Sequence, residues 1–454
     1  MKKDIKSVIP GFYTVDDALG FNEATTKEMQ YKHMNKTRAE MCSSKYFVKA
    51  DDFRFYDENG VEHIDMISAV GVCSAGNNNR YIWGEICKVV DSGQFTMGVV
   101  SLHNVPAAFA ANMAKLSPGG QLTKMATATG GAEAIENALK LVKLATRDKP
   151  HLTHILSCEG AFHGKTTGAV TVGGKDLWRQ WVTGLPTAAH DYVPFGDADA
   201  LEAALKKGIY KAFFFEPIQG ENGIKVPPAG YYKKIRELCD KYDCLMVDDE
   251  IQAGTGRTGK LWCIEWEDVV ADVLVFAKGV SGGLIPFAGI LAKEEIFNAA
   301  YLSPETCFHH TATYQDNNLC AAAGNATLQW IYENDMLDQV KAKGDYLIAG
   351  LNKLWEKYPN IITEIRGRGL MVGIELAMIP EDKVEKVGVP FYGLLVESIL
   401  INDYHIQILH TVNNSATFRF LPPFTITTEY LDKAINALEN AIKKAVELVM
   451  RCEK

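Results

Sequence analysis

The chain has 454 residues, of which 47% are hydrophobic, and its formal net charge is −9. This length fits two domains, or one large domain with appendages, and the composition excludes a disordered chain. The acidic balance and the lack of a long Lys/Arg run argue against nucleic-acid binding. Ten cysteines without a CxxC pair argue against a disulfide framework or a metal site.

The segment Met1–Pro10 lacks the apolar core of a signal peptide, and no stretch of about 18 apolar residues could span a bilayer. We therefore expect a cytoplasmic protein that neither binds nor crosses membranes, with thiols that stay reduced.

Short apolar runs bounded by Gly or Pro alternate with amphipathic stretches, which predicts an α/β architecture. In chain order, the predicted elements are a helix at 132–146, strands at 154–158 and 212–216, a helix at 231–242, strands at 244–248 and 273–277, and a long amphipathic helix from Thr427. We expect an N-terminal segment at 1–69, a large domain at 70–335 and a smaller C-terminal domain at 336–454. The N-terminal segment should belong partly with the smaller domain.

Lys278 is the strongest single candidate for chemistry. It ends the apolar run 273–277 and enters a loop that contains Gly279, Gly282 and Gly283. Desolvation at such a place lowers the pKa of an amine and frees it to form an imine. A solvated lysine is the competing interpretation.

Polar residues near other predicted elements could share the same site, because ligands of a parallel sheet bind outside the carboxyl ends of its strands. Asp248 or Asp249 could keep the ring nitrogen of a pyridine cofactor protonated, and these residues alone do not choose between them. Gly130 and Gly131 open a helix whose free N–H groups could bind phosphate. Phe162 could stack on a flat ring, or could simply be a core residue in a turn.

Three motifs in order, at 216–223 (EPIQGENG), 246–259 (MVDDEIQAGTGRTG) and 272–283 (DVLVFAKGVSGG), resemble the class III aminotransferases. These are fold-type-I enzymes that use pyridoxal 5′-phosphate (PLP), and they include ornithine, acetylornithine, 4-aminobutyrate and putrescine aminotransferases. The resemblance runs from about Phe53 to the C-terminal helix. It implies a large domain with a mostly parallel sheet flanked by helices, plus a smaller α+β domain built from both terminal segments.

The resemblance implies a set of cofactor-binding residues, with Lys278 and Asp249 as the catalytic pair. The set is Gly130, Gly131, Ala132, Phe162, His163, Glu216, Asp249, Ile251, Gln252, Lys278 and Thr313. Lys278 would bind PLP as a Schiff base and later move a proton. Asp249 would contact the pyridine nitrogen, and Gln252 the 3′ oxygen.

Further roles follow from the same resemblance. Ile251 and Phe162 would cover the two faces of the ring, and the backbone of Gly131 and Ala132 would bind the phosphate. Thr313 would reach the phosphate from a neighbouring subunit, which implies a homodimer, or a dimer of dimers, with shared active sites.

The implied substrate-binding residues are Arg419, Glu221, Lys165 and Val70. Arg419 would grip the α-carboxylate of an oxo or amino acid. Glu221 would pair with that arginine when the substrate has no α-carboxylate at its reacting end. Lys165 stands where relatives that bind a distal carboxylate carry arginine, and some diamine-using relatives have lysine there.

We therefore expect a ping-pong aminotransferase that takes an amino group from a diamine or ω-amino compound, or from an amino acid, and passes it to a 2-oxo acid. Two alternatives remain open. One is a PLP-dependent racemase or epimerase on the same scaffold, and the other is a non-catalytic PLP-binding module. No metal is expected.

Overall fold

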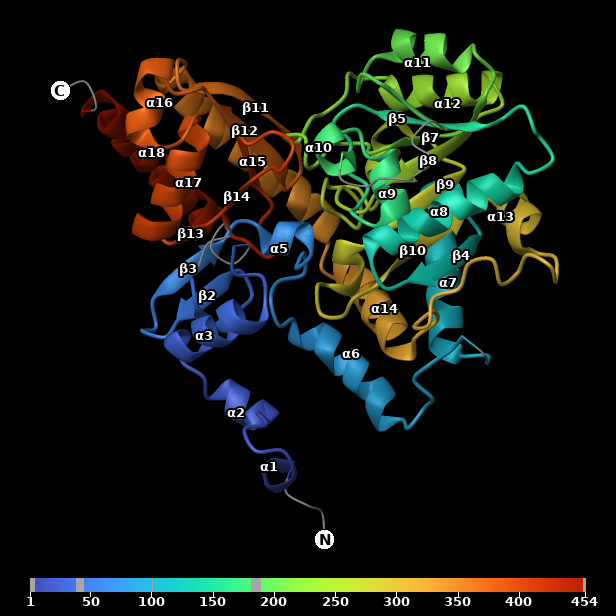
Figure 1. The fold of residues 1–454 in the computed structure, drawn as a ribbon, viewed down its shortest axis with the longest axis horizontal. Coiled ribbons are helices and arrows are strands. Elements are labelled where there is room, and N and C mark those ends of the chain that lie inside the picture. The colour runs from blue at the N-terminus through green and yellow to red at the C-terminus, as the bar shows by residue number, and fades with distance from the viewer. Residues whose placement is uncertain (1–4, 38–44, 100, 181–188, 452–454) are drawn as a thin grey trace.

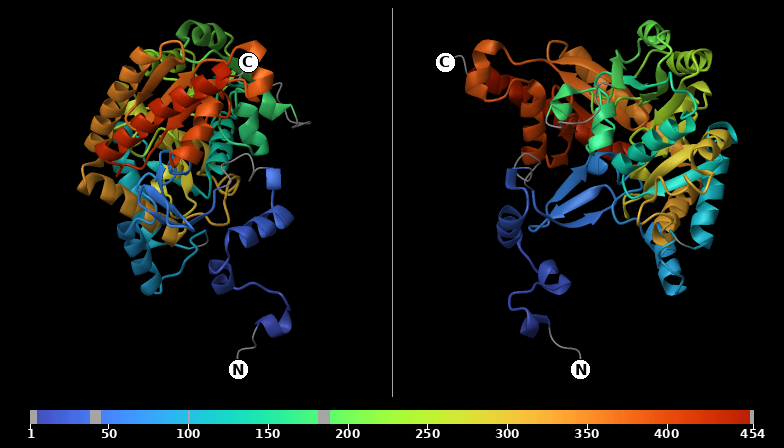
Figure 2. Two further views of the ribbon diagram at one scale, coloured as in Figure 1. Left: turned by 90° about the vertical axis from the view of Figure 1, so that its left-hand side faces the viewer. Right: turned by 45° about the vertical axis from the view of Figure 1, so that its right-hand side comes forward.

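The computed structural model describes residues 5–37, 45–99, 101–180 and 189–451, and it contains three β-sheets (Figure 1). We call them the central, C-terminal and N-terminal sheets. Two further views show α1 and α2 extending away from the body of the molecule (Figure 2).

The central sheet has seven strands in the order β4-β10-β9-β8-β7-β5-β6. Strand β10 is antiparallel to both of its neighbours, and the remaining pairs are parallel. The strands are β4 (Lys124–Ala128), β5 (His154–Cys158), β6 (His190–Val193), β7 (Tyr210–Phe215), β8 (Leu245–Asp249), β9 (Val273–Phe276) and β10 (Ala288–Ala292).

Helices cover both faces of this sheet, which explains why its inner strands β7, β9 and β10 are almost entirely apolar. In β7, Phe213 and Phe215 pack on one face and Phe214 on the other, as alternation along a strand requires. One face is covered by α8 (Gly131–Ala145), α9 (Thr167–Val172) and α13 (Glu294–Tyr301). The other is covered by α7 (Asn104–Leu116), α11 (Ala198–Leu205), α12 (Tyr231–Lys241) and α14 (Asn318–Glu333).

The C-terminal sheet is antiparallel, with the order β11-β12-β15-β14. Its strands are β11 (Ile362–Arg368), β12 (Met371–Leu376), β14 (Leu409–His410) and β15 (Thr417–Phe420). The accompanying helices are α15 (Met336–Lys357), α16 (Glu381–Val387), α17 (Tyr392–Asp403) and α18 (Thr428–Arg451).

The N-terminal sheet joins both ends of the chain. Its strands are β1 (Phe47–Asp51), β2 (Arg54–Asp57), β3 (Glu62–Asp65) and β13 (Ile406–Gln407), and β13 pairs with β3 in parallel. The remaining helices and 3-10 turns are α1 (Ile5–Val8), α2 (Val15–Leu19), α3 (Glu23–His33), α5 (Ser68–Gly71), α6 (Arg80–Asp91), α10 (Asp176–Arg179), η1 (Pro118–Gly120), η3 (Cys263–Glu267) and η4 (Lys278–Ser281).

The predicted strands and helices are all present, with ends that shift by no more than two residues where an end was predicted. Strand β3 pairs with β13, so the N-terminal segment shares a sheet with the C-terminal part of the chain. The proposed division at 335/336 falls between α14 and α15, and the three boundaries stay a prediction.

Within the described part of the chain, no helix is long and apolar enough to cross a membrane, and no group of three or more His, Cys, Asp or Glu side chains is arranged to hold a metal ion. The eight cysteines in this part of the chain are free thiols.

Candidate active site

A cavity of about 410 Å³ lies at the carboxyl ends of the parallel strands of the central sheet. It is lined by Val72, Thr129, Gly130, Gly131, Ala132, Phe162, His163, Gly164, Glu216, Glu221, Asp249, Ile251, Gln252, Ala277, Lys278, Ser281, Gly283, Leu284, Ile285, Pro286 and Phe287. Ten of the eleven predicted cofactor-binding residues are among them. The predicted location of the site, outside the strand ends, therefore matches the structure.

Lys278 is separated from the end of β9 by Ala277 and is the first residue of η4. Its φ is +48°, a left-handed conformation that is costly for a residue with a Cβ atom and that concentrates at functional sites. Burial lowers the pKa of its amine below the usual value, although the nearby Glu221 carboxylate acts in the opposite direction. The neutral, nucleophilic form of this amine is therefore easier to reach than in a solvated lysine.

Asp249 ends β8 and faces the cavity. Its Oδ2 lies 2.7 Å from His163 Nδ1, and its Oδ1 accepts the Ile251 N–H at 3.0 Å. Burial alone would lower the pKa of His163, but the bond to Asp249 outweighs it, so the pKa of this histidine is raised. The pair thus places a carboxylate, oriented by a second side chain, against the cavity wall.

Asp248 takes no part in this wall. Successive residues of a strand point to opposite faces, so Asp248 and Glu250 project away from the cavity and are buried in the core. Burial, together with the neighbouring Glu250 and Asp249, raises the pKa of Asp248 well above its usual range, and burial raises the pKa of Glu250 to about 8. Of the two aspartates that the sequence left open, only Asp249 lines the cavity.

Glu216 follows β7 and holds two loops in place. Its Oε1 accepts the Phe162 N–H at 2.9 Å, and its Oε2 accepts the Gly220 N–H at 3.1 Å. Burial raises the pKa of this carboxyl to about 7, and His163 partly offsets the effect. Glu216 therefore holds the backbone of Phe162, a residue of the cavity wall.

The first turn of α8 forms a backbone cradle. The first N–H groups of a helix have no intrahelical acceptor, and the helix dipole adds positive potential there. Glycine is required for the close packing around this turn: a Cβ on Gly131 would lie 3.0 Å from Ile251 Cδ1, and one on Gly164 would lie 2.6 Å from Ala132 Cβ. The arrangement suits a phosphate group.

Glu221 separates the cavity from Arg419. Its Oε1 lies 2.5 Å from Arg419 Nη1, and both side chains are buried, Arg419 at 1% exposure. Gln252 Nε2 lies 3.4 Å from the same oxygen, and the Val412 N–H reaches Oε2 at 3.3 Å. Burial would raise the pKa of Glu221, but Arg419 and Lys278 lower it overall. Glu221 lines the cavity whereas Arg419 does not.

Besides Arg419, three predicted site residues lie outside the cavity lining. Val70 belongs to a left-handed turn, α5, and Val72 reaches the cavity instead. Lys165 is exposed, with its ammonium 4.0 Å from the centre of a Trp178 ring. Thr313 is exposed on the loop between α13 and α14.

Sequence reasoning missed several residues of the site, notably the apolar wall at 284–287 and the bridge between Trp178 and Asn413. A Leu-Ile-Pro-Phe run carries no chemical signal by itself, and the bridge joins residues 235 positions apart.

Comparison with known proteins agrees with this geometry. The sequence model of the class-III aminotransferases matches residues 36–442. An uncharacterized aminotransferase of Schizosaccharomyces pombe is 50% identical over 434 residues, which cover 96% of this chain and 89% of that protein. The ornithine aminotransferase of Toxoplasma gondii is 25% identical, with a TM-score of 0.84, and covers 98% of this chain and 100% of that one.

A second structure of the Toxoplasma gondii enzyme is 25% identical to this chain, with a TM-score of 0.82, and the match covers 99% of this chain and 100% of the other. That structure is described as having partial occupancy of PLP at its active site. The cavity described above fits such a group. It offers a buried amine, an oriented carboxylate, and a glycine-lined helix start in which a Cβ would clash. Among the described residues, Gln252 Oε1 has no hydrogen-bond partner although it is buried, so the wall also holds spare hydrogen-bonding capacity.

Proposed function

Because the chain belongs to the class-III aminotransferases, whose cofactor is PLP, we propose that it moves an amino group from a diamine or ω-amino donor to a 2-oxo acid by a ping-pong mechanism. The cofactor supplies an electron sink and carries the amino group between the two half-reactions. The proposal depends most on the placement of Glu221 between the cavity and Arg419.

This placement gives the site two states. While Glu221 pairs with Arg419, the guanidinium is neutralised and the cavity suits a donor that has no carboxylate beside the reacting amine. A 2-oxo acid carries that carboxylate, which must displace Glu221 to reach Arg419, where a two-pronged contact holds it. One cavity can therefore accept two substrates of different shape in turn.

The roles of the remaining residues follow from their positions. Lys278 would bind the cofactor covalently and move a proton at the substrate carbon. Asp249, oriented by His163, would keep the pyridine nitrogen protonated, and the start of α8 would bind the phosphate. Phe162, fixed through Glu216, would cover one ring face and Ile251 the other. Lys165, beside Phe162 and Trp178, would meet the distal end of the donor.

A donor panel tests the proposal. Enzyme loaded with PLP is mixed with putrescine, ornithine, lysine and 4-aminobutyrate, and separately with alanine and glutamate, while the visible absorbance of the cofactor is followed. We expect at least one of the first four compounds to bleach it rapidly, and Lys278→Ala to show no such change. Fast reaction with alanine or glutamate, while putrescine, ornithine, lysine and 4-aminobutyrate are all inert, would contradict the proposed donor class. Inversion of one enantiomer without an oxo acid would indicate a racemase.

We also propose that two copies of the chain complete each cavity, with Thr313 of one copy reaching the phosphate bound by the other. Exposure of Thr313 on its own chain, outside the cavity lining, supports this arrangement. Sedimentation should show a dimer or a larger even assembly, and Thr313→Val should weaken PLP binding without changing the assembly. A monomer that binds PLP at full strength would contradict it.

A further inference from the structure

Asn413 joins the C-terminal sheet to the layer of the central sheet. It lies in the turn between β14 and β15, and all four of its polar groups bond to that layer. Its N–H donates to the Glu221 carbonyl at 2.9 Å, and its carbonyl accepts from Lys175 Nζ at 3.2 Å. Its side-chain Oδ1 accepts the indole N–H of Trp178 at 2.9 Å, and its Nδ2 donates to the Gly160 carbonyl at 2.9 Å.

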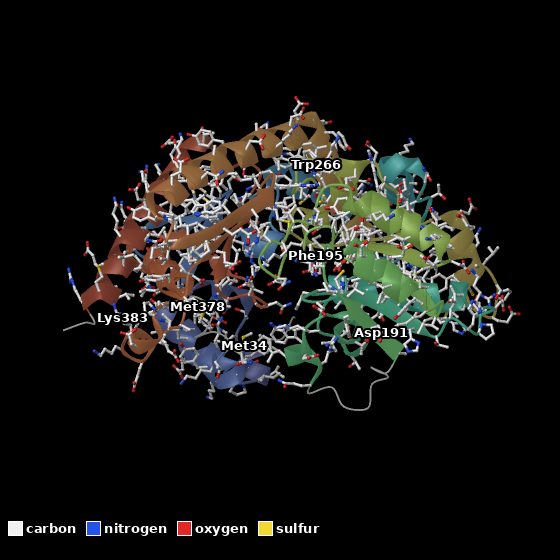
Figure 3. All side chains as sticks on the ribbon, turned by 90° about the horizontal axis from the view of Figure 1, so that it is seen from above. Met34, Asp191, Phe195, Trp266, Met378 and Lys383 are labelled. Atoms are coloured by element: carbon white, nitrogen blue, oxygen red, sulfur yellow. The ribbon has the colours of Figure 1, made fainter. Side chains whose placement is uncertain are left out.

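These four bonds span the boundary between the two sheets. Trp178 belongs to α10, which lies on the side of the central sheet that faces the C-terminal sheet (Figure 1). Figure 3 shows the same two sides from above, with Met378 and Lys383 on one and Phe195 and Asp191 on the other. Asn413 is 8% exposed, so its bonds are largely shielded from water and strong enough to fix a turn.

The turn that Asn413 fixes holds the carboxylate of Glu221. The neighbouring Val412 donates its N–H to Glu221 Oε2 at 3.3 Å. When a substrate carboxylate takes Arg419, the donors that remain for this buried charge are the Val412 amide and the Gln252 side chain. A buried carboxylate that loses its donors is costly, so this amide determines how easily Glu221 can leave Arg419.

We infer that Asn413 is a positioning residue for the 2-oxo acid: it holds the Val412 amide where Glu221 can rest after an α-carboxylate has displaced it from Arg419. The inference rests on the function proposed above and adds to it a residue outside the cavity lining. It concerns one half-reaction only. A donor without an α-carboxylate leaves the Glu221–Arg419 pair intact and does not need the resting place.

The next residue provides a matched control. Asn414 has the same side chain, but its Nδ2 donates to Glu375 Oε2 at 3.2 Å and its Oδ1 accepts the Ala416 N–H at 3.2 Å. Both partners belong to the C-terminal sheet or its turn. Truncation of Asn414 therefore disturbs the same turn but leaves the side-chain hydrogen bonds to the central-sheet layer in place.

The test measures the two half-reactions separately in the PLP-loaded enzyme. Pyruvate and 2-oxoglutarate serve as acceptor probes, and the fastest amine of the panel serves as the donor. In Asn413→Ala the Val412 amide is no longer held in place, and Glu221 loses a charge-assisted hydrogen bond. We therefore expect KM for the acceptors to rise about tenfold, with donor kinetics within about twofold of wild type. Trp178→Phe, which removes the indole N–H donor and leaves both side-chain groups of Asn413 in place, should raise the acceptor KM by a smaller factor, and Asn414→Ala should match wild type.

Equal losses in both half-reactions of Asn413→Ala, or none in either, would overturn the inference, because a merely structural role does not discriminate between donor and acceptor. Trp178→Phe guards against misfolding of the alanine variant, since it keeps an aromatic side chain at this position and leaves Asn413 unchanged. Glu221→Gln shows whether a negative result concerns Asn413 alone or the proposed function as well. If Glu221→Gln changes the ratio of the acceptor KM to the donor KM while Asn413→Ala does not, only the role of Asn413 is wrong. If neither changes it, the proposed exchange at Arg419 is also wrong.

Discussion

Removal of the Glu221 carboxylate should turn Arg419 into an unsatisfied cation beside an enlarged cavity. The Arg419 side chain is 1% exposed, and within the described part of the chain its remaining hydrogen bond is a 3.4 Å contact with the His410 carbonyl. Loss of one partner from a buried ion pair costs roughly 3–5 kcal/mol. Because the cavity admits water once Glu221→Ala has opened it, we expect the lower end of that range, which lowers Tm by several degrees.

A small carboxylate should reverse this loss. Acetate has the charge of the missing group and fits a cavity of about 410 Å³, and it is not an amino acceptor. A ligand present at 100 times its Kd stabilises the folded state by about 2.7 kcal/mol, which is close to the expected deficit. Scanning calorimetry of PLP-loaded Glu221→Ala in sodium acetate, against sodium chloride at equal ionic strength, should therefore show a rise in Tm that wild type lacks. The same variant should bind 2-oxo acids more tightly and amine donors less tightly.

Glu375→Ala is the matched control for this experiment. Glu375 also pairs with an arginine, Arg366, on a neighbouring strand, but Arg366 keeps Glu364 and the Gly223 carbonyl as partners. Its loss should lower Tm without rescue by acetate. Equal acetate effects in wild type, Glu221→Ala and Glu375→Ala would refute the reasoning that Glu221 occupies a carboxylate site.

Two further predictions concern the cavity walls. Gly164→Ala should weaken PLP binding roughly tenfold in a fluorescence titration, because the new Cβ would lie 2.6 Å from the Cβ of Ala132. Gly208→Ala is the control, since Gly208 also has a positive φ but has open space around it, and this variant should bind PLP normally. Equal affinities of the two variants for PLP would contradict the packing argument. Glu216→Gln should remove a pH dependence of stability. The Glu216 carboxyl has a pKa of about 7 in the folded chain and of 4.5 in the unfolded chain. The free energy of unfolding of wild type should therefore fall by about 3 kcal/mol relative to Glu216→Gln as the pH rises from 4.5 to 7. A difference in Tm between the two proteins that stays constant from about pH 4 to 8 would contradict this prediction.

Much of the architecture could be predicted because it follows from local pattern. Four apolar runs form strands of the central sheet, and their carboxyl ends form the cavity. The residues alone left Asp248 and Asp249 equivalent. Because successive side chains of a strand point to opposite faces of the sheet, only one of the two can face the cavity. Which one it is depends on how β8 pairs with β7 and β9, and this register is known only from the structure.

Contacts between distant segments could not be predicted in the same way. The bond between Glu216 and the Phe162 backbone, and the bridge from Trp178 to Asn413, depend on how loops meet after the sheet has formed. Val70 was predicted to touch substrate, yet the left-handed turn at 68–71 brings Val72 to the cavity wall. A turn of this hand is unfavourable for residues with side chains and has no simple sequence signature.

Covalent trapping tests the central claim most directly. The PLP-loaded enzyme is reduced with borohydride, which converts an imine to a stable secondary amine, and the digested protein is searched by mass spectrometry for the phosphopyridoxyl group. We predict the group on Lys278, at the end of β9, and no trapped group in Lys278→Ala. A phosphopyridoxyl group on another lysine of the wild-type chain, or none at all, would contradict the account.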